Sequence, residues 1–550
     1  MTGRLSMGPP RAGDREKAVP RGSRRRAKAA RRVRSVVVPG TFPADNEARP
    51  WASLHERMGS RRNNAASGAW HQLLDRASGA VLLSVVAYVP WAANTTVPWL
   101  TWLLVAGCWL SGFLLLAKWV VRPQDLDWDD SPPRRAWMAR VPIILMAVFS
   151  TALLAQVAVS VWNHSAAVVR LPDGLEWTYR ASRPGWPTTW DRDATLAALT
   201  RYIGLVAIFW AMRDWMQQGD AERGPGGDGG RPRLPRRLRG VAWTLAISAG
   251  AMALTGIVHR LDKAKDLLWL MPLKDTPYTQ MFGSFPYRAN AGQFFNMIWP
   301  LLVGAWLASQ RGPSLRDLRG GTSRSGGASS FLVLCAVVMI AAVFTAASRM
   351  AIAIAIVQVV LVSLVAGFLS QDARVRFGLA GGLLAALALG WFAQGDFLRK
   401  RFENALVDST LSNRTVIYDY ARPMAARFPT WGWGAEAFRT YGELHRTSLR
   451  MNPEFVHDDR LEVVGGVGWV GAALAMACLA LLPVMANTSG TTRVAAPSLG
   501  LLWVGMMGLL IHACVDYPLQ VPVIQVTWVI LAAIAATCPW RSGRRRTTPA

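Results

Sequence analysis

Apolar stretches of about 17–23 residues recur along this chain, and they decide what it can fold into. A helix of about 20 residues crosses the ~30 Å hydrocarbon core of a bilayer at ~1.5 Å per residue. Of the 550 residues, 52% are hydrophobic and only 17% are charged, which argues against a soluble protein. The sequence therefore predicts a polytopic membrane protein.

Twelve stretches are predicted to cross the membrane as helices, because a backbone in lipid must satisfy its hydrogen bonds internally. They are residues 77–93, 97–117, 141–161, 195–212, 240–258, 291–309, 330–347, 350–369, 377–394, 462–484, 496–513 and 519–537. The predicted fold class is all-α. Residues 1–76 are expected to form a basic, disordered tail, 77–540 the membrane-embedded domain, and 541–550 a C-terminal tail.

Lysine and arginine set the predicted orientation, since cytoplasmic segments carry an excess of both. With the N-terminus inside, the inside segments hold 40 of the 61 Lys and Arg residues, and the outside segments hold 20. Twelve crossings make both termini cytoplasmic. The longest outside segment, 395–461, lies between the ninth and tenth predicted helices, and we expect it to be ordered, with short helices over the membrane.

The net charge of +27 follows mainly from this topology. The basic tail, which includes Arg24–Arg34, fits attraction to anionic lipids of the inner leaflet. Nucleic-acid binding is the alternative for such a tail, but no recognition fold follows it, and no nucleic-acid partner is predicted. The sequence carries neither a metal-binding motif nor a nucleotide-binding glycine loop, so no metal and no other cofactor are predicted.

Arginines on the outside face are informative because topology disfavours them. Arg349 lies in a tight turn between two apolar stretches, where a charge is costly unless paired; anion binding is favoured over a snorkelling or helix-capping role. Further candidates are Arg288, Arg414, Arg422 and Arg460, since a guanidinium fork fits phosphate oxygens. Each alone is equally well explained as a solvated charge, but together they predict an anion site.

A histidine at the outer start of the tenth predicted helix is the candidate base. His457 stands in "FVHDDRLEVVGGVGWVG" (Phe455–Gly471). An imidazole can take a proton from a hydroxyl, and the neighbouring Asp459 is a candidate to orient it. The alternative is a capping cluster, in which Asp458 or Asp459 caps the helix and His457 is incidental.

Two residues near the outer end of the eleventh predicted helix are also candidates. His512 and Asp516 lie four residues apart in "IHACVDYPLQVP" (Ile511–Pro522). They either close the same pocket or simply hydrogen-bond to each other.

Several motifs together resemble the O-antigen ligase and polymerase superfamily of bacterial membrane proteins. "GSFPYRANAGQFF" (Gly283–Phe295) is similar to its G-[ST]-F-x-N-x-N-x-F-A stretch, and "SRMAIAIA" (Ser348–Ala355) to its SRGA-x-LA. "NRTVIYDYARPMAARFPTWGWGAEAF" (Asn413–Phe438) resembles R-x-x-x-W…P-x-x-G-x-G-x-x-x-F. "HDDRLEVVGGVGWVG" resembles H-N-D-Y-L-E-x-x-x-E-x-G-x-x-G, and "HACVDYPLQVP" resembles H-S-x-x-D-[FY]-P-L-x-x-P. The resemblance covers about residues 75–540.

This resemblance implies a metal-independent, inverting glycosyltransferase of the bacterial inner membrane. It would move a glycan from an undecaprenyl-diphosphate carrier to an acceptor hydroxyl at the periplasmic face, in lipopolysaccharide, O-antigen or exopolysaccharide biosynthesis. Carried over residue by residue, the catalytic base falls on His457 and the diphosphate-binding arginines on Arg349 and Arg414. The residues predicted to bind substrate are Arg288, Asn290, Arg422, Asp459, Arg460, His512 and Asp516.

Departures from the family pattern leave the acceptor open. Tyr287 and Tyr418 stand where an asparagine and a tryptophan are usual, Arg460 where a tyrosine is usual, and Gly466 where an acidic residue is usual. A polysaccharide polymerase of the same superfamily is one alternative. A transporter or flippase for lipid-linked sugars is another, but it predicts polar residues spread through the middle of several helices. The expected partners are the lipid-linked donor, a lipid or glycan acceptor, and membrane lipids.

Overall fold

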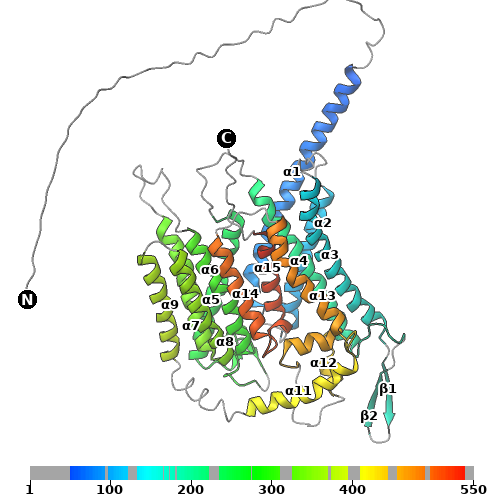
Figure 1. Ribbon diagram of the computed structural model, residues 1–550, viewed down its shortest axis with the longest axis vertical. Helices are drawn as coiled ribbons and strands as arrows, with labels where there is room; N and C mark the ends of the chain where they lie inside the picture. Colours follow the sequence, from blue (N-terminus) through cyan, green and yellow to red (C-terminus); the bar gives the residue numbers. More distant parts are fainter. Residues whose placement is uncertain are drawn as a thin grey trace, which may run out of the picture. The chain divides into compact units, whose positions relative to one another are not determined.

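The structure of the chain is a computed structural model (Figure 1). It describes residues 50–92, 97–121, 133–164, 166–171, 174–179, 183–221, 234–273, 276–309, 325–369, 373–393, 409–443, 455–489 and 496–538. The chain divides into two compact units, residues 1–61 and residues 62–550. Residues 1–49 and 541–550, predicted as tails, lie outside the described residues.

A helix occupies each of the twelve predicted stretches, which confirms the all-α fold class. The helices are α1 (Pro50–Tyr88), α2 (Pro98–Val120), α3 (Pro133–Trp162), α4 (Arg192–Ala221), α5 (Arg236–Leu261), α6 (Arg288–Ser309), α7 (Ser325–Ala346), α8 (Arg349–Leu369), α9 (Ala373–Ala393), α13 (Asp459–Ser489), α14 (Ala496–His512) and α15 (Pro522–Thr537). Among the described residues, nine helices are long and apolar enough to cross a membrane, and two shorter apolar helices lie at Gly500–His512 and Pro522–Thr537. The chain is a multi-pass membrane protein.

The first helix begins earlier than expected. Residues 50–76, predicted as part of the disordered tail, lie in α1, which continues to Tyr88. Proline at the first helical position presets the backbone angle, and no further proline interrupts the sequence before Pro90. The apolar span within this helix runs from Gly68 to Trp91.

Helix α6 is the most enclosed of the nine, with 94% of its apolar span buried. It packs against α7, α8 and α14. Its first turns carry buried polar side chains, including Asn290, Gln293 and Asn296. The Asn296 amide donates to the carbonyl of Ala351, 2.8 Å away, which ties α6 to the beginning of α8.

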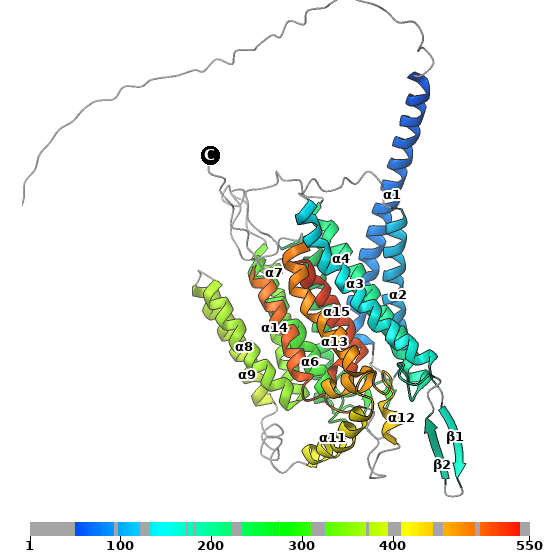
Figure 2. The same ribbon diagram turned by 45° about the vertical axis from the view of Figure 1, so that its right-hand side comes forward.

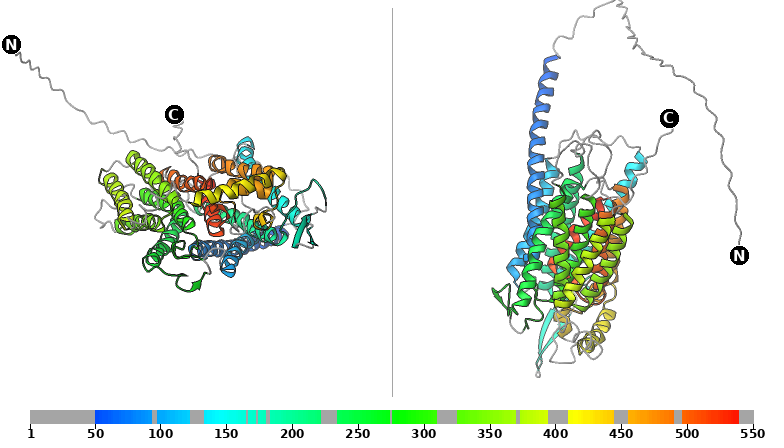
Figure 3. Two further views of the ribbon diagram at one scale, coloured as in Figure 1. Left: turned by 90° about the horizontal axis from the view of Figure 1, so that it is seen from below. Right: turned by 90° about the vertical axis from the view of Figure 1, so that its left-hand side faces the viewer.

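A second set of helices packs around α13. This helix contacts α3 and α15, and α15 also contacts α4, α6 and α14 (Figure 3). The contacts of α15 therefore join the helices around α6 to those around α13.

Short elements gather at one end of the helices, called the loop end here (Figure 2). They are the antiparallel pair β1 (Ala166–Leu171) and β2 (Gly174–Tyr179), the short pair β3 (Asp266–Leu267) and β4 (Met271–Pro272), and the helices α11 (Ser409–Arg427) and α12 (Phe438–Glu443). The helices α11 and α12 agree with the prediction of an ordered segment within 395–461. The strands were not predicted, although the valines of β1 and the aromatic residues of β2 favour extended backbone.

Candidate functional site

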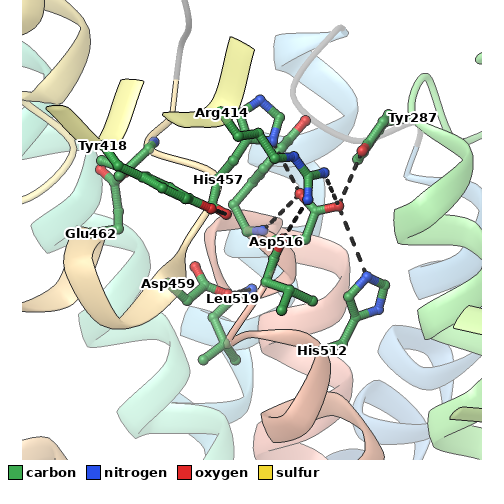
Figure 4. A network of polar contacts seen from close by, with 12 residues as sticks. Tyr287, Arg414, Tyr418, His457, Asp459, Glu462, His512, Asp516 and Leu519 are labelled. Atoms are coloured by element: carbon green, nitrogen blue, oxygen red, sulfur yellow. Dashed lines mark hydrogen bonds and ion pairs between the residues drawn. The ribbon is translucent and has the colours of Figure 1, made fainter. Parts of the chain in front are cut away.

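The site centres on His457 and Asp516, which approach each other at the loop end (Figure 4). His457 lies two residues before the first residue of α13, and Asp516 lies between α14 and the short 3-10 turn η5 (Pro518–Gln520). His457 Nδ1 lies 3.1 Å from Oδ1 of Asp516. With a proton on Nδ1, the ring donates to the carboxylate and its Nε2 carries the lone pair of a base.

Asp516 collects several partners within the protein. Its Oδ2 accepts a hydrogen bond from the Tyr287 hydroxyl at 3.1 Å and one from Nη2 of Arg414 at 3.3 Å. The backbone N–H of Tyr517 donates to Oδ1 at 3.1 Å. His512 Nε2 lies 3.9 Å from Oδ2. This carboxylate therefore joins side chains from α11 and α14 with side chains from the residues just before α6 and α13.

The surroundings keep Asp516 ionised. Burial acts to raise the pKa of its carboxyl group, but the hydrogen bond from His457 and the charge of Arg414 outweigh burial, so that the pKa lies below its ordinary value. Burial and the neighbouring charge of Asp516 raise the pKa of Tyr287, so that its hydroxyl stays protonated and remains a donor.

The backbone and ring of His457 are both held. Its backbone is in the left-handed region, with φ of 60°, and its carbonyl accepts a hydrogen bond from the Tyr418 hydroxyl at 3.0 Å. Its ring meets the Tyr517 ring at 81°, with centroids 4.7 Å apart. Tyr517 is stacked between Tyr287, at 5.6 Å, and Phe455, at 4.6 Å. An unusual backbone angle held by such contacts is typical of functional sites.

The acidic residues after His457 support the helix start. The carboxylate of Asp458 accepts hydrogen bonds from the backbone N–H groups of Arg460 and Leu461, as a capping side chain does. Asp459 is buried and accepts the N–H of Leu519 at 2.8 Å and the amide of Gln520 at 2.9 Å. The carboxylate beside His457 is thus Asp516, whereas Asp459 holds the η5 turn.

Arg414 is the predicted arginine that joins the His457 cluster directly. It comes from the first turns of α11, is half-buried, and also donates to the carbonyl of Val515 at 2.7 Å. Arg460 is exposed and pairs with Asp458 at 2.9 Å and with the carbonyl of Cys514 at 3.0 Å. Arg422 is exposed and lies over the Tyr418 ring, 5.8 Å from its centroid.

The other predicted residues lie on α6, α8 and α14. Arg288 begins α6, is buried, and donates to the carbonyl of Thr279 at 2.8 Å. Asn290, two residues further on, is buried, and its Nδ2 has no hydrogen-bond partner within the described residues. His512 is buried at the end of α14, where Nδ1 lies 3.0 Å from Oε1 of Gln293. Arg349 is the half-buried first residue of α8.

Two phenol groups in the network were not predicted as site residues. Tyr287 binds the carboxylate of Asp516, and Tyr418 binds the backbone of His457. Both stand at positions where the sequence departs from the family pattern, which was the available signal.

Glycines allow the loop that follows α11 to pack closely against the backbone of α13. Inside α13, Gly468 has φ of 66° and ψ of −178°, which breaks the helix. The carbonyls of Gly465 and Gly466 accept hydrogen bonds from the backbone N–H groups of Trp433, at 2.7 Å, and Gly434, at 3.0 Å. A Cβ on Gly468 would lie 2.2 Å from the carbonyl oxygen of Thr430. The segment Pro429–Gly434 ("PTWGWG") and the helix that follows His457 are therefore packed backbone to backbone.

The described residues contain no group of three or more His, Cys, Asp or Glu side chains that could hold a metal ion. The lack of a metal requirement stays a prediction from the sequence.

The fold and the site define a class: an all-α, multi-pass membrane protein with a buried, ionisable cluster at one end of its helices. A comparison with protein families matches residues 334–476 to the O-antigen ligase family, and this match supports the resemblance to the O-antigen ligase superfamily. The matched region contains Arg349, Arg414 and His457. No curated protein matches the chain. The match supports a role as a ligase- or polymerase-type glycosyltransferase in polysaccharide biosynthesis.

Proposed function

We propose that the protein transfers a glycan from an undecaprenyl-diphosphate carrier to an acceptor hydroxyl at the periplasmic face of the inner membrane. The loop end then faces the periplasm, and both termini are cytoplasmic, as the lysine and arginine distribution predicts. The observation that carries the proposal is the pairing of His457 with the ionised, buried Asp516, beside Arg414.

His457 acts as the general base. With Nδ1 donating to Asp516, Nε2 takes the proton from the acceptor hydroxyl, and Asp516 stabilises the imidazolium that forms. The acceptor oxygen attacks the anomeric carbon on the face opposite the carrier, so the configuration inverts. The bond between the anomeric carbon and the phosphate oxygen breaks, and its electron pair leaves with the lipid diphosphate.

Arginines stabilise the leaving group. Arg414 donates a hydrogen bond to Asp516, the partner of His457. In this scheme its guanidinium also shares its charge with a diphosphate oxygen. Arg349 lies at the start of α8, and α8 packs against α6 and α14. Arg288 contributes further positive charge from the start of α6. No metal or nucleotide takes part in the scheme.

Two alternatives differ in their products. A polymerase of the same superfamily would pass the glycan to another repeat unit. A flippase would move the lipid-linked sugar without breaking the sugar–phosphate bond, and the clustering of His457, Arg414 and Asp516 at one end of the helices favours bond cleavage there.

Release of undecaprenyl diphosphate separates these functions. Purified protein in liposomes is incubated with lipid-linked donor and with or without acceptor. The proposal expects lipid diphosphate and glycosylated acceptor in equal amounts, and neither product from Arg349→Ala. Translocation without lipid diphosphate would refute the proposal in favour of a flippase. Chain growth on the donor itself would identify a polymerase.

A further inference from the structure

A cavity of about 330 Å³ lies between α3, α4, α13 and α15. Its lining follows α13 from Glu462 to Leu482, a helical path of about 30 Å at ~1.5 Å per residue. The hydrocarbon core of a bilayer is of similar thickness, ~30 Å. The cavity is therefore elongated along the direction in which a lipid chain would lie.

The walls of the cavity are largely apolar. Phe209, Leu482 and Trp528 are among the residues that line it. Its charged lining side chains, among the described residues, are Glu436 and Glu462, which belong to the loop end. Glu436 forms an ion pair with Arg201 of α4, and Glu462 accepts the backbone N–H of Val456 at 2.8 Å. A lining of this kind takes hydrocarbon rather than sugar or phosphate.

One short segment connects the cavity to the His457 site. The segment is residues 515–520. At its beginning, the carbonyl of Val515 accepts a hydrogen bond from Arg414, and the carboxylate of Asp516 contacts the His457 ring. At its end, Leu519 and Gln520 line the cavity. A lipid whose chain fills the cavity therefore has its head group beside the residues proposed to hold diphosphate.

We propose that this cavity holds the part of the donor's polyisoprenyl chain that lies next to the diphosphate. The inference rests on the proposed function, and it names where the carrier binds. A cavity of about 330 Å³ has room for part of one chain, so it fits the donor, which has one chain attached to its diphosphate, better than an acceptor lipid with several chains. The chain lies between α3, α4, α13 and α15, and the diphosphate lies at Arg414.

Narrowing the cavity tests the proposal kinetically. Ala475 lines the cavity, whereas Ala473, on the same helix, is exposed on another side. Ala475→Phe is expected to raise KM for a full-length undecaprenyl donor about tenfold, because chain burial is lost, with kcat within about twofold. The KM of Ala475→Phe for a donor with two isoprene units should stay unchanged. The control Ala473→Phe should keep the wild-type KM for both donors. A raised acceptor KM with an unchanged donor KM would overturn the proposal in favour of an acceptor lipid.

A binding readout separates this proposal from the proposed function. Undecaprenyl phosphate with a diazirine in the isoprene units nearest the phosphate is photolysed with the His457→Ala protein, and labelled peptides are mapped by mass spectrometry. Labels are expected on α13 and α15, to be reduced by Ala475→Phe, and to survive a large excess of phospholipid. Labels elsewhere, or loss of labelling in phospholipid, would overturn the chain site. Transfer by His457→Ala would instead refute the catalytic role and leave the labelling result intact.

Discussion

His457 Nδ1 lies 3.1 Å from Oδ1 of Asp516, a residue 59 positions further along the chain. The pair joins the start of α13 to the end of α14. The same carboxylate holds Tyr287 and Arg414, so the base, its orienting group and a candidate diphosphate ligand are fixed relative to one another.

Asp516→Asn should lower kcat by roughly 100-fold or more while changing KM by less than about threefold. The amide cannot stabilise the imidazolium, and it does not select the same tautomer. Steady-state transfer by the purified variant measures this. Asp458→Asn is the matched control, because Asp458 caps α13 and is not the carboxylate paired with His457; it should keep kcat within about threefold. Equal kcat values in the two variants would show that Asp516 does not orient the base.

Arg414→Lys should recover only part of the activity that Arg414→Ala loses. Arginine donates to Val515 and Asp516 with different nitrogens, and a lysine ammonium lacks this planar fork. We expect kcat/KM to fall by about 100-fold in Arg414→Ala and about 10-fold in Arg414→Lys. Arg422→Ala, on the exposed side of the same helix, should cause a smaller loss than either. Full activity of Arg414→Lys would mean that charge alone suffices.

Stability should fall in acid because of Asp516. Its pKa is lower in the folded protein than the ordinary value of about 3.9, so the folded state binds fewer protons than the unfolded state. The stabilising contribution is present above pH of about 4 and is lost as the pH falls through the lower, folded-state pKa. Tryptophan fluorescence during heating measures Tm, and the chain has 26 tryptophans. The wild type should lose more Tm between about pH 6 and pH 3 than Asp516→Asn does; parallel curves would contradict the assignment.

Gly468→Ala should destabilise the protein by about 1–3 kcal/mol or more. The added methyl group would meet the carbonyl of Thr430 in a backbone conformation that favours glycine. Gly367→Ala, in α8, meets no atom within 4 Å and should be neutral or slightly stabilising. Thermal unfolding in detergent measures both. Equal Tm values for the two variants would show that the break in α13 is not required.

The helices could be predicted because a helix that crosses a bilayer needs a long apolar segment, and such segments are easily recognised in the sequence. The break at Gly468 could not, since "GGVGWVG" shows flexible residues but not which of them adopts a positive φ. The β1–β2 pair was missed because each strand is six residues long, too short to leave a distinct pattern in the sequence.

The sequence named several residues of the His457 cluster, but it did not give their contacts. His457, Arg414, His512 and Asp516 were all named as candidates, and the structure brings them together. Asp459 was considered as the orienting acid because it is near in sequence, but consecutive residues at a helix start point in different directions. The backbone N–H of Asp459 donates to the carbonyls of Ala513 and Asp516, which brings the start of α13 to the segment after α14. No local pattern in the sequence reports such a contact.

Transfer by His457→Ala tests most directly whether this histidine is the base. Wild-type and variant proteins are reconstituted in liposomes with an undecaprenyl-diphosphate-linked glycan and an acceptor, and glycosylated acceptor is measured over time. The variant should give no product above the level without protein, although its Tm and its membrane insertion match those of the wild type. Transfer by the variant at the wild-type rate would contradict the assignment of His457 as the catalytic base.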